Sequence, residues 1–513
     1  MRWYRIAVAA CVVAGLLLRT RGLGSIPLWL DEAMWADRMI HGSIWVASIR
    51  PIGFMAVSKG LVACFGAREL VLRLLPWLAG CGTVLLSVPL APRLLTHRAA
   101  QLLFIAIMAF QPAAIDFSKE FKPYSISLFF HVACLYFALG YVKEQKLSEL
   151  AGAAGCALLG LFFAQDVVFA LPSLYAVLAL VALERRLHRH LFVAAGGAAL
   201  TLGLLLAFYL LVWRGLVSPH QEESYWGKKY DVFFVHHRGG GPHWRWLLDK
   251  LGDVAAMPGQ RGERWGKVGP LSAETVAAFA GFYRAFWIAL AGLGVVRLLQ
   301  RKRFLELALV VGPLFVVVTF NSLGLWPFGA FRTNLFLVAY SSALAASALD
   351  GFQALERFEL APVLLATVLP LVAFERTWNG EKLWAGGGLP FNDLTDTLVR
   401  LQGRRHRHQH REPLVLDGNA CKVFHFYMKQ HPDYRALDRD FEKRFSTLCE
   451  TDDSALSAAE EKSSGERVWA ILASPRARDL AERGHIANLI DERPMPNQGP
   501  LLLELGPPPP TEL

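Results

Sequence analysis

Apolar runs long enough to cross a membrane follow one another through about three quarters of the chain. Roughly 17 to 25 apolar residues span a hydrocarbon layer about 30 Å thick. The pattern therefore predicts about 11 transmembrane helices. The predicted spans cover residues 4–20, 72–92, 99–115, 123–141, 150–165, 167–183, 191–213, 274–296, 304–321, 331–349 and 358–374.

The composition supports this interpretation. Hydrophobic residues make up 54% of the 513 residues and charged residues only 19%, and the mean hydropathy is +0.33. A soluble domain has about a quarter charged residues, because its surface must be polar. The composition thus excludes a plain cytosolic enzyme, a disordered chain and a disulfide-rich scaffold.

The positive charges indicate the orientation of the spans. The net charge is +10, but the basic residues lie in short loops between apolar runs, which argues against a nucleic-acid partner. The positive-inside rule then predicts a multi-pass protein of the inner (cytoplasmic) membrane with a cytoplasmic N-terminus. An odd number of spans places the C-terminal part outside, in the periplasm. The predicted outer segments are residues 21–71, 113–122, 214–273 and those after 375.

The residues after the last predicted span have a different pattern. Strand-like runs at 413–416, 468–472 and 501–505 alternate with helical stretches at 423–430 and 477–483. This alternation predicts a small α/β domain over residues 375–506, followed by a disordered Pro-rich tail at 507–513.

Two of the seven cysteines, Cys421 and Cys449, fall in this C-terminal domain. An extracytoplasmic compartment is oxidising, so disulfides persist there. The predicted topology therefore favours a Cys421–Cys449 disulfide; the alternative is two free thiols too far apart to react.

The first outer segment contains two adjacent acids, Asp31 and Glu32, between Trp29 and Trp35. A partly desolvated acid at the water–lipid boundary can have the pKa that a general base needs. The alternative is a solvated pair at a helix N-terminus, where the helix dipole favours negative charge. Spacing alone favours this second interpretation.

Two further outer sites carry positive charge. Residues 115–125 place Lys119, Glu120 and Lys122 just before Pro123, which is suited to the first turn of the following helix. These cations could hold a lipid-linked phosphate or could be lysines that snorkel at the end of a span. Arg332 lies at the outer start of another predicted span, where its guanidinium suits either a phosphate or a structural partner.

The long outer loop at 214–273 holds four tryptophans among lysines and histidines. Aromatic rings can stack on sugars, but they also form ordinary interfacial belts. These tryptophans are Trp226, Trp244, Trp246 and Trp265.

Taken in order, these segments resemble a known family. The Asp-Glu pair is followed by Arg-Pro-Ile-Gly-Phe at 50–54, by residues 65–76, by Ser-Lys-Glu-Phe-Lys-Pro-Tyr-Ser at 118–125 and by Pro-Phe-Gly-Ala-Phe-Arg at 327–332. The order is similar to that of GT-C membrane glycosyltransferases, specifically the bacterial glycosyltransferase family 39 and RgtA/B/C/D-like group. Protein O-mannosyltransferases and the lipid A aminoarabinose transferase are relatives of that group. The resemblance implies a GT-C-like catalytic domain over residues 1–374.

The resemblance also implies roles for individual residues. Asp31 becomes the candidate catalytic base, and Glu32 is expected to shape the acceptor site. Glu120, Lys122 and Tyr124 match a Ser-x-Glu-x-Arg-x-Tyr segment on the donor side, with Lys122 in place of the usual arginine.

Two arginines complete the comparison. Arg50 stands where the family more often has proline, which leaves the shape of that loop in doubt. Arg73 matches an arginine common to the group and is expected to be structural. Arg332 is expected on the donor phosphate with Lys122.

The implied activity is an inverting transfer of a sugar from a polyprenyl-phosphate carrier to a hydroxyl on a lipid, protein or polysaccharide. Membrane lipid is the expected surrounding. Some relatives use a divalent cation and others do not, so metal dependence stays open, with Asp31 and Glu32 as the only candidate ligands. No GxGxxG, P-loop or His-Glu-x-x-His motif is present in the sequence, which argues against nucleotide and zinc-peptidase chemistry.

Two other classes remain open. A lipid or polysaccharide transporter or flippase would carry acids at mid-membrane, whereas the acids here lie at the outer ends of spans. Asp166 is the nearest exception, and the predicted topology puts it at an outer turn. A purely structural membrane subunit is the third alternative.

Overall fold

The structure is a computed structural model that divides into two compact units, which are described separately. One unit comprises residues 1–21, 44–57 and 74–377, and the other comprises residues 22–43, 58–73 and 378–513. The residues described are 2–24, 28, 30–42, 51–213, 233–234, 243–259, 273–330, 332–350, 412–431, 445–450, 468–473, 486–489 and 500–505.

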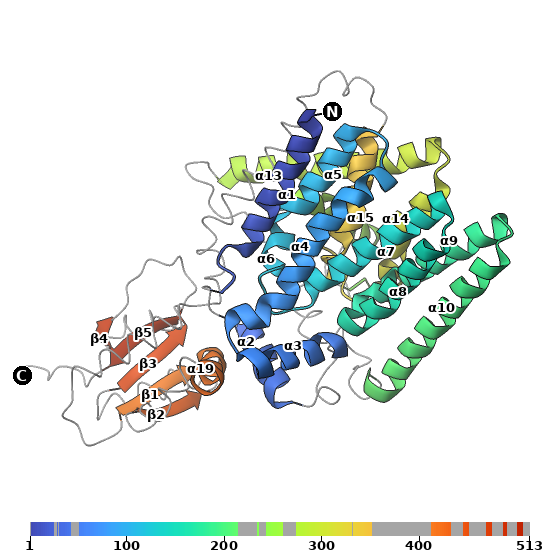
Figure 1. The fold of residues 1–513 in the computed structure, drawn as a ribbon. Coiled ribbons are helices and arrows are strands. Elements are labelled where there is room, and N and C mark those ends of the chain that lie inside the picture. Colours follow the sequence, from blue (N-terminus) through green and yellow to red (C-terminus); the bar gives the residue numbers. More distant parts are fainter. Residues whose placement is uncertain are drawn as a thin grey trace, which may run out of the picture. The chain divides into compact units, whose positions relative to one another are not determined.

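The first unit is a bundle of helices (Figure 1). Among the described residues, six helices are long and apolar enough to cross a membrane, and five shorter helices are also apolar. The protein is thus a multi-pass α-helical membrane protein, as predicted. The helices of this unit are α1 (Arg2–Thr20), most of α4 (Glu69–Leu94), α5 (Arg98–Phe110), α6 (Pro112–Phe117), α7 (Tyr124–Glu144), α8 (Leu147–Phe163), α9 (Leu171–Glu184), α10 (His188–Phe208), α12 (His243–Ala256), α13 (Ala273–Gln300), α14 (Phe304–Ser322) and α15 (Leu337–Leu349).

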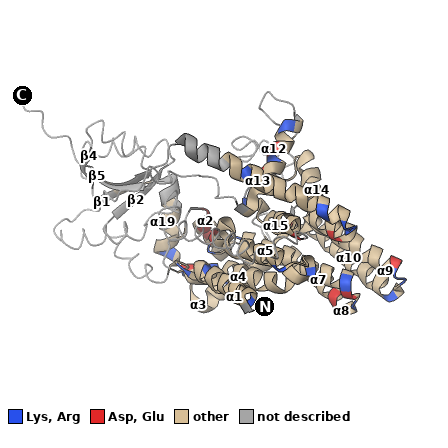
Figure 2. Ribbon diagram, turned by 90° about the horizontal axis from the view of Figure 1, so that it is seen from above, with Lys and Arg blue, Asp and Glu red and all other residues tan. Residues whose placement is uncertain are grey.

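Short irregular turns connect several of these helices. They are the 3₁₀ turns η1 (Gln165–Phe169), η4 (Met257–Gly259) and η5 (Arg332–Asn334), and the π turn η2 (Tyr209–Trp213) that ends α10. Ten of the eleven predicted spans coincide with helices, and the eleventh, at 358–374, lies outside the described residues. Figure 2 shows charged residues near the ends of helices such as α8 and α9, away from their middles.

Two helices, α5 and α15, form the centre of the bundle. Every residue of α5 from Ala100 to Phe110 is buried, and α15 is buried from Leu337 to Ala348. Their sequences are apolar on all sides, which is the pattern of a helix enclosed by other helices. Helices α1, α7, α12, α13 and α14 pack against this pair. The bundle exposes large apolar side chains, for example Phe192, Leu211 and Phe282, as a lipid-facing surface requires.

One buried arginine joins two helices at a helix end. Arg19, in the last turn of α1, is completely buried. Its guanidinium donates to the carbonyl oxygens of Ala109 (2.6 Å) and Met108 (3.0 Å), near the C-terminus of α5. The last four carbonyls of a helix have no partner within the helix and carry partial negative charge. Arg19 therefore satisfies acceptors that the apolar surroundings would otherwise leave unpaired.

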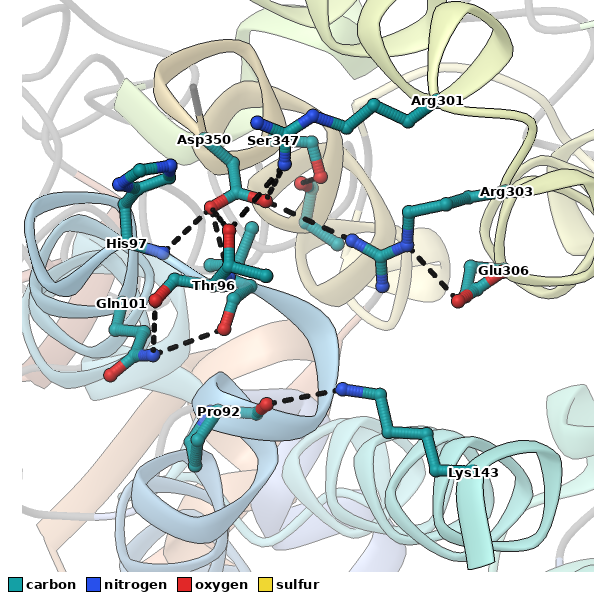
Figure 3. A network of polar contacts seen from close by, with 12 residues as sticks. Pro92, Thr96, His97, Gln101, Lys143, Arg301, Arg303, Glu306, Ser347 and Asp350 are labelled. Carbon is teal, nitrogen blue, oxygen red and sulfur yellow. Dashed lines mark hydrogen bonds and ion pairs between the residues drawn. The ribbon is translucent and has the colours of Figure 1, made fainter. Parts of the chain in front are cut away.

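A second polar centre joins three chain segments around Asp350 (Figure 3). The carboxylate of Asp350 is buried and accepts hydrogen bonds from the backbone N–H groups of Thr96 and His97 and from the Thr96 hydroxyl, each at 2.8 Å. Arg301 donates to the other carboxylate oxygen at 2.8 Å, and Arg303 lies 3.8 Å from it. Asp350 thus connects the end of α15 with the α4–α5 and α13–α14 turns.

In its described residues, the second unit contains a five-stranded sheet together with helical segments. The strand order is β2-β1-β3-β5-β4: β1 pairs in parallel with β2 and β3, while β5 is antiparallel to β3 and β4. Helix α19 packs against β1. The strands are β1 (Glu412–Asp417), β2 (Phe445–Glu450), β3 (Val468–Ala473), β4 (Ile486–Leu489) and β5 (Pro500–Leu505), and α19 covers Gly418–Gln430.

The three strand-like runs of the sequence coincide with β1, β3 and β5. The predicted helix at 477–483 and the predicted disordered tail at 507–513 lie outside the described residues. Cys421 takes part in a disulfide, which is consistent with the predicted Cys421–Cys449 pairing. The other five cysteines, all within the described residues, are free.

The second unit also includes part of the first predicted outer segment. This segment forms two helices that the apolar pattern did not indicate, α2 (Leu30–His41) and α3 (Ile52–Phe65). Residues 22–43 and 58–73 belong to the same compact unit as the C-terminal residues, and α2 packs against α19. The chain therefore brings the acidic motif and the C-terminal domain together in one unit.

The Asp350 centre yields a test of how the helical unit is held together. Replacing Asp350 with alanine leaves two backbone donors and Arg301 without their shared acceptor, so we expect the free energy of unfolding to fall by about 3 kcal/mol. The measurement is unfolding of the full chain in detergent micelles. Glu306→Gln serves as the control, because Glu306 pairs only locally with Arg303 at i,i+3, and such a pair contributes about 0.5 kcal/mol. Equal losses for both variants would contradict this role for Asp350.

Candidate functional site

The acidic motif occupies the first turn of α2. Asp31 and Glu32 follow the first residue of this helix, where the helix dipole favours negative charge. Successive residues of a helix point about 100° apart around its axis. Glu32 points into the unit and is 1% exposed, whereas Asp31 is half-buried. The two adjacent acids therefore have different surroundings.

Glu32 forms a buried ion pair with Arg73, on the second turn of α4. The Nε and Nη2 atoms of Arg73 donate to the two carboxylate oxygens of Glu32 at 2.9 and 2.6 Å. The third guanidinium nitrogen donates to the carbonyl oxygen of Leu23 at 3.2 Å. This two-pronged geometry is the strongest form of such a pair. Arg73 thus has the structural position that the sequence suggested, and it holds Glu32 in place.

The same ion pair bears on whether Asp31 and Glu32 could bind a metal. Both oxygens of Glu32 accept hydrogen bonds from Arg73, so a cation would have to displace this arginine. Within the residues that the structure describes, no group of three or more His, Cys, Asp or Glu residues is arranged to hold a metal ion. The carboxylate of Glu32 is therefore engaged by Arg73 in this structure.

The basic motif lies in the helical unit, in the short connection between α6 and α7. Lys119, Glu120 and Lys122 are all buried there, at 8%, 0% and 2% exposure. The backbone N–H of Lys122 donates to the carbonyl oxygen of Glu120 at 2.7 Å, which makes the turn tight. Pro123 is the N-cap of α7, close to its predicted place. A snorkelling lysine extends its ammonium towards water, and the burial of these lysines within the protein does not fit that alternative.

Aromatic rings enclose both sides of this turn. Tyr124 begins α7 and packs edge-on against Phe117 of α6, with ring centroids 5.2 Å apart. Phe121 is fully buried and contacts Phe54, with centroids 5.1 Å apart. These contacts hold the turn against α3 and α6.

A close helix contact also fixes the start of this segment. Gly80 of α4 lies against Ser118: a Cβ atom at position 80 would be 2.5 Å from the Ser118 Cβ atom. The Ser118 hydroxyl donates to the carbonyl oxygen of Ile115 at 2.6 Å. Real Cβ atoms essentially never come so close, so only glycine allows α4 and this turn to pack as they do.

Arg332 lies in η5, which packs against α7. The turn that carries it is organised by buried Asn334, whose side-chain amide donates to the carbonyl oxygens of Pro327 (3.0 Å) and Gly329 (2.9 Å). The indole N–H of Trp326 donates to the Asn334 side-chain oxygen at 2.9 Å. The structure thus brings the half-buried Arg332 to the helix that begins just after Lys122.

Asp166 is a further acid near the start of α7. It lies in η1, the turn between α8 and α9. The hydroxyl of Ser127, one turn into α7, donates to its carboxylate at 2.5 Å. Burial raises the pKa of Asp166 to about 7. A buried acid of perturbed pKa is a functional-site signal that depends on tertiary contacts, so the sequence placed Asp166 in a turn but did not indicate its burial or its contact with Ser127.

The tryptophans of the long outer loop separate into two groups. Trp246 on α12 is buried and packs against Phe234, with ring centroids 5.8 Å apart, whereas Trp244 is exposed. The burial of Trp246 gives it a structural role. Trp226 and Trp265 lie outside the described residues.

Comparison with solved structures identifies the fold. The crystal structure of ArnT from Cupriavidus metallidurans in the apo state covers 98% of this chain and 97% of its own, with a TM-score of 0.52 and 14% identity. The same protein bound to undecaprenyl phosphate covers 98% of both chains, with a TM-score of 0.53 and 12% identity. The chain has the GT-C fold.

This result confirms the fold class predicted from the sequence. The Saccharomyces cerevisiae protein O-mannosyltransferase Pmt1-Pmt2 complex bound to the sugar donor is also similar, over 41% of this chain and 33% of that chain, but its TM-score of 0.33 and identity of 16% add nothing to the argument. No protein-family model matches the sequence, and no curated protein matches it.

The contact at Gly80 yields the second test. Gly80→Ala places a methyl group against Ser118 and forces the turn that begins at Ser118 away from α4, so we expect the free energy of unfolding to fall by about 1–3 kcal/mol. Gly155→Ala on α8 is the matched control, because nothing lies within 4 Å of a Cβ atom there. Alanine favours helix over glycine by about 1 kcal/mol, so the control is neutral or stabilising. Unfolding in detergent measures both variants, and a harmless Gly80→Ala would refute the close contact.

Proposed function

We propose that this protein is a membrane glycosyltransferase that moves a sugar from a polyprenyl-phosphate carrier to a hydroxyl of a lipid, protein or polysaccharide. The proposal rests on the buried turn at residues 118–123, called the Lys122 turn below, in a chain with the GT-C fold. Arg332 lies on η5, which packs against α7, the helix that follows this turn. ArnT, which shares this fold over nearly the whole chain, has been solved with undecaprenyl phosphate bound. An ammonium and a guanidinium both suit the phosphate of such a carrier.

In the proposed reaction, the acceptor oxygen attacks C1 of the sugar from the face opposite the carrier. The new C1–O bond forms as the bond between C1 and the phosphate oxygen breaks, which inverts the configuration at C1. The acceptor proton passes to the Asp31 carboxylate, and the carrier leaves as a polyprenyl phosphate. General-base assistance of this kind accelerates a reaction by about 10²–10⁴-fold.

The proposal divides the roles of the site residues. Asp31 is the base, and Glu32 shapes the acceptor side by fixing α2 through Arg73. Lys122 and Arg332 stabilise the negative charge that develops on the leaving phosphate, where preorganised cations contribute most. Glu120 and Tyr124 belong to the donor side with Lys122. No step of the proposed reaction passes through a metal ion, although a divalent cation is common to some relatives of the fold.

The proposed setting is the inner membrane, with the N-terminus in the cytoplasm and the C-terminal domain in the periplasm. The basic loops of the sequence support this orientation. Nucleotide sugars are absent from the outer side of this membrane, so a lipid-linked donor is the chemical form that can supply the sugar there. A transporter is not favoured, because the acids and bases of the motifs lie at helix ends.

The role of Asp31 is tested by Asp31→Asn. Asparagine keeps the shape of the side chain but cannot accept the proton, so we expect transfer to fall by about 10²–10⁴-fold while the protein stays folded. Membranes of a deletion strain supply the natural donor and acceptor, and mass spectrometry of the envelope glycans measures transfer. Asp37→Asn on the same helix is the control, because its side chain is 52% exposed and pairs only with His41. Normal transfer by Asp31→Asn would show that Asp31 is not the base.

The role of Lys122 is tested by binding of undecaprenyl phosphate to the full-length protein in lipid nanodiscs. A charged hydrogen bond contributes about 1.5–3 kcal/mol, so Lys122→Ala should weaken binding by roughly ten- to a hundred-fold. Lys122→Arg, the residue usual in the family, should retain binding. Lys143→Ala, at the opposite end of α7, is the control. If Lys122→Ala binds the carrier as well as the control does, Lys122 does not contact the phosphate.

A further inference from the structure

A buried hydrogen-bonded network in the second unit connects the C-terminal domain to the acidic motif. Tyr427 and His431 lie on one face of α19 and just beyond its end, at 0% and 5% exposure. Both contact the buried carboxylate of Glu69, at the start of α4: the Tyr427 hydroxyl donates to Oε1 at 2.8 Å, and His431 Nε2 lies 3.0 Å from Oε2. The two helices are thereby joined through one carboxylate.

The Tyr427 hydroxyl has a second partner, in the segment that leads into α2. The backbone N–H of Leu28 donates to the Tyr427 oxygen at 2.7 Å, and Leu28 is 1% exposed. Leu28 is two residues before the start of α2 and three before Asp31. Burial and the nearby charge of Glu69 raise the pKa of Tyr427 well above its ordinary value. The hydroxyl therefore keeps its proton, so it can donate to Glu69 while it accepts from Leu28.

The network continues on the next turn of α4. Arg73, four residues after Glu69, holds both oxygens of Glu32 and the carbonyl oxygen of Leu23. The segment before α2 and the first turn of α2 are thus held at Leu23, Leu28 and Glu32. Tyr427 supplies one of these three anchors from α19, and through Glu69 it contacts the helix that supplies the other two.

We infer that the C-terminal domain contributes to the transferase activity. Tyr427 on α19 positions the first turn of α2, and with it Asp31. This inference rests on the proposed function, in which Asp31 is the base. Tyr427 and Glu69 are positioning residues, since their contacts run to the backbone and ion pair beside Asp31. A base displaced by about 1 Å costs up to a hundred-fold in rate, so a single hydroxyl at this place has a measurable effect on turnover.

The structural part of the inference is tested by hydrogen exchange on the full-length protein. Tyr427→Phe removes the acceptor of the Leu28 N–H and leaves the ring in place. We expect exchange in residues 28–32 to become at least ten-fold faster, while the strands of the sheet keep their protection. Met428→Ala is the matched control, because Met428 is buried on the same helix at 1% exposure but is outside the network. Truncating this side chain should lower the protection of the whole domain rather than that of residues 28–32 alone. Unchanged exchange at residues 28–32 in Tyr427→Phe would overturn the inference.

The functional part is tested by a double-mutant cycle with Asp31→Asn. If Tyr427 acts through Asp31, Tyr427→Phe slows transfer by about 10- to 100-fold in the wild-type background and has no further effect on the residual transfer of Asp31→Asn. Binding of undecaprenyl phosphate should stay within two-fold of wild type in every variant. If Tyr427→Phe slows transfer by the same factor in the wild-type and Asp31→Asn backgrounds, the two residues act independently and the inference is overturned.

The two hypotheses fail in distinguishable ways. Full transfer by Asp31→Asn would refute Asp31 as the base. The hydrogen exchange of residues 28–32 in Tyr427→Phe would then still test whether Tyr427 holds α2. Loss of transfer in Asp31→Asn together with normal transfer in Tyr427→Phe would keep the proposed function and refute the role of the C-terminal domain. Glu69→Gln adds a third comparison, because glutamine can still accept from Tyr427 and should retain most of the activity that Tyr427→Phe loses.

Discussion

The ion pair between Glu32 and Arg73 is the constraint on which the acidic side of the site depends. Each side chain is almost completely buried, and an ionised group in such surroundings is stable only when it is paired and hydrogen-bonded. Arg73 donates hydrogen bonds to both oxygens of Glu32. This pair fixes how the first turn of α2 is rotated about the helix axis. That setting leaves the neighbouring Asp31 half-buried, which is compatible with its proposed role as the base.

The same rule explains the polar residues inside the helical unit. Arg19 satisfies two carbonyls near the end of α5, and Asp350 satisfies two backbone N–H groups before α5 begins. Water cannot solvate the ends of an enclosed helix, so side chains from other elements take its place. Both ends of the central helix are thus bound to neighbouring elements. These contacts fix the bundle that presents the Lys122 turn.

The sequence predicted the parts of the fold that arise from local pattern. The apolar runs gave the positions of the described spans, and three short alternating runs in the C-terminal region correspond to β1, β3 and β5. Helices α2 and α3 were not predicted from the apolar pattern, because short helices have neither the length of a span nor the repeat of a strand. The order of motifs indicated Asp31, Lys122 and Arg332. The contact of Asp166 with Ser127 and that of Tyr427 with Glu69 join residues 39 and 358 positions apart. Such pairings leave no periodic signal in a single sequence.

The lysine at position 122 shows how burial changes the meaning of a substitution. In the family that the sequence resembles, an arginine is expected at this place, and its planar fork can bind two phosphate oxygens at once. Here the turn is closed by the hydrogen bond between the backbone groups of Lys122 and Glu120 and is enclosed by Phe121 and Tyr124. A compact ammonium places the same charge in less space, and Arg332 on the adjacent η5 retains a guanidinium fork. Under the proposed function, Lys122 therefore supplies charge to the phosphate and Arg332 supplies directional hydrogen bonds. This division explains how a lysine can serve at a position where the family that the sequence resembles has arginine.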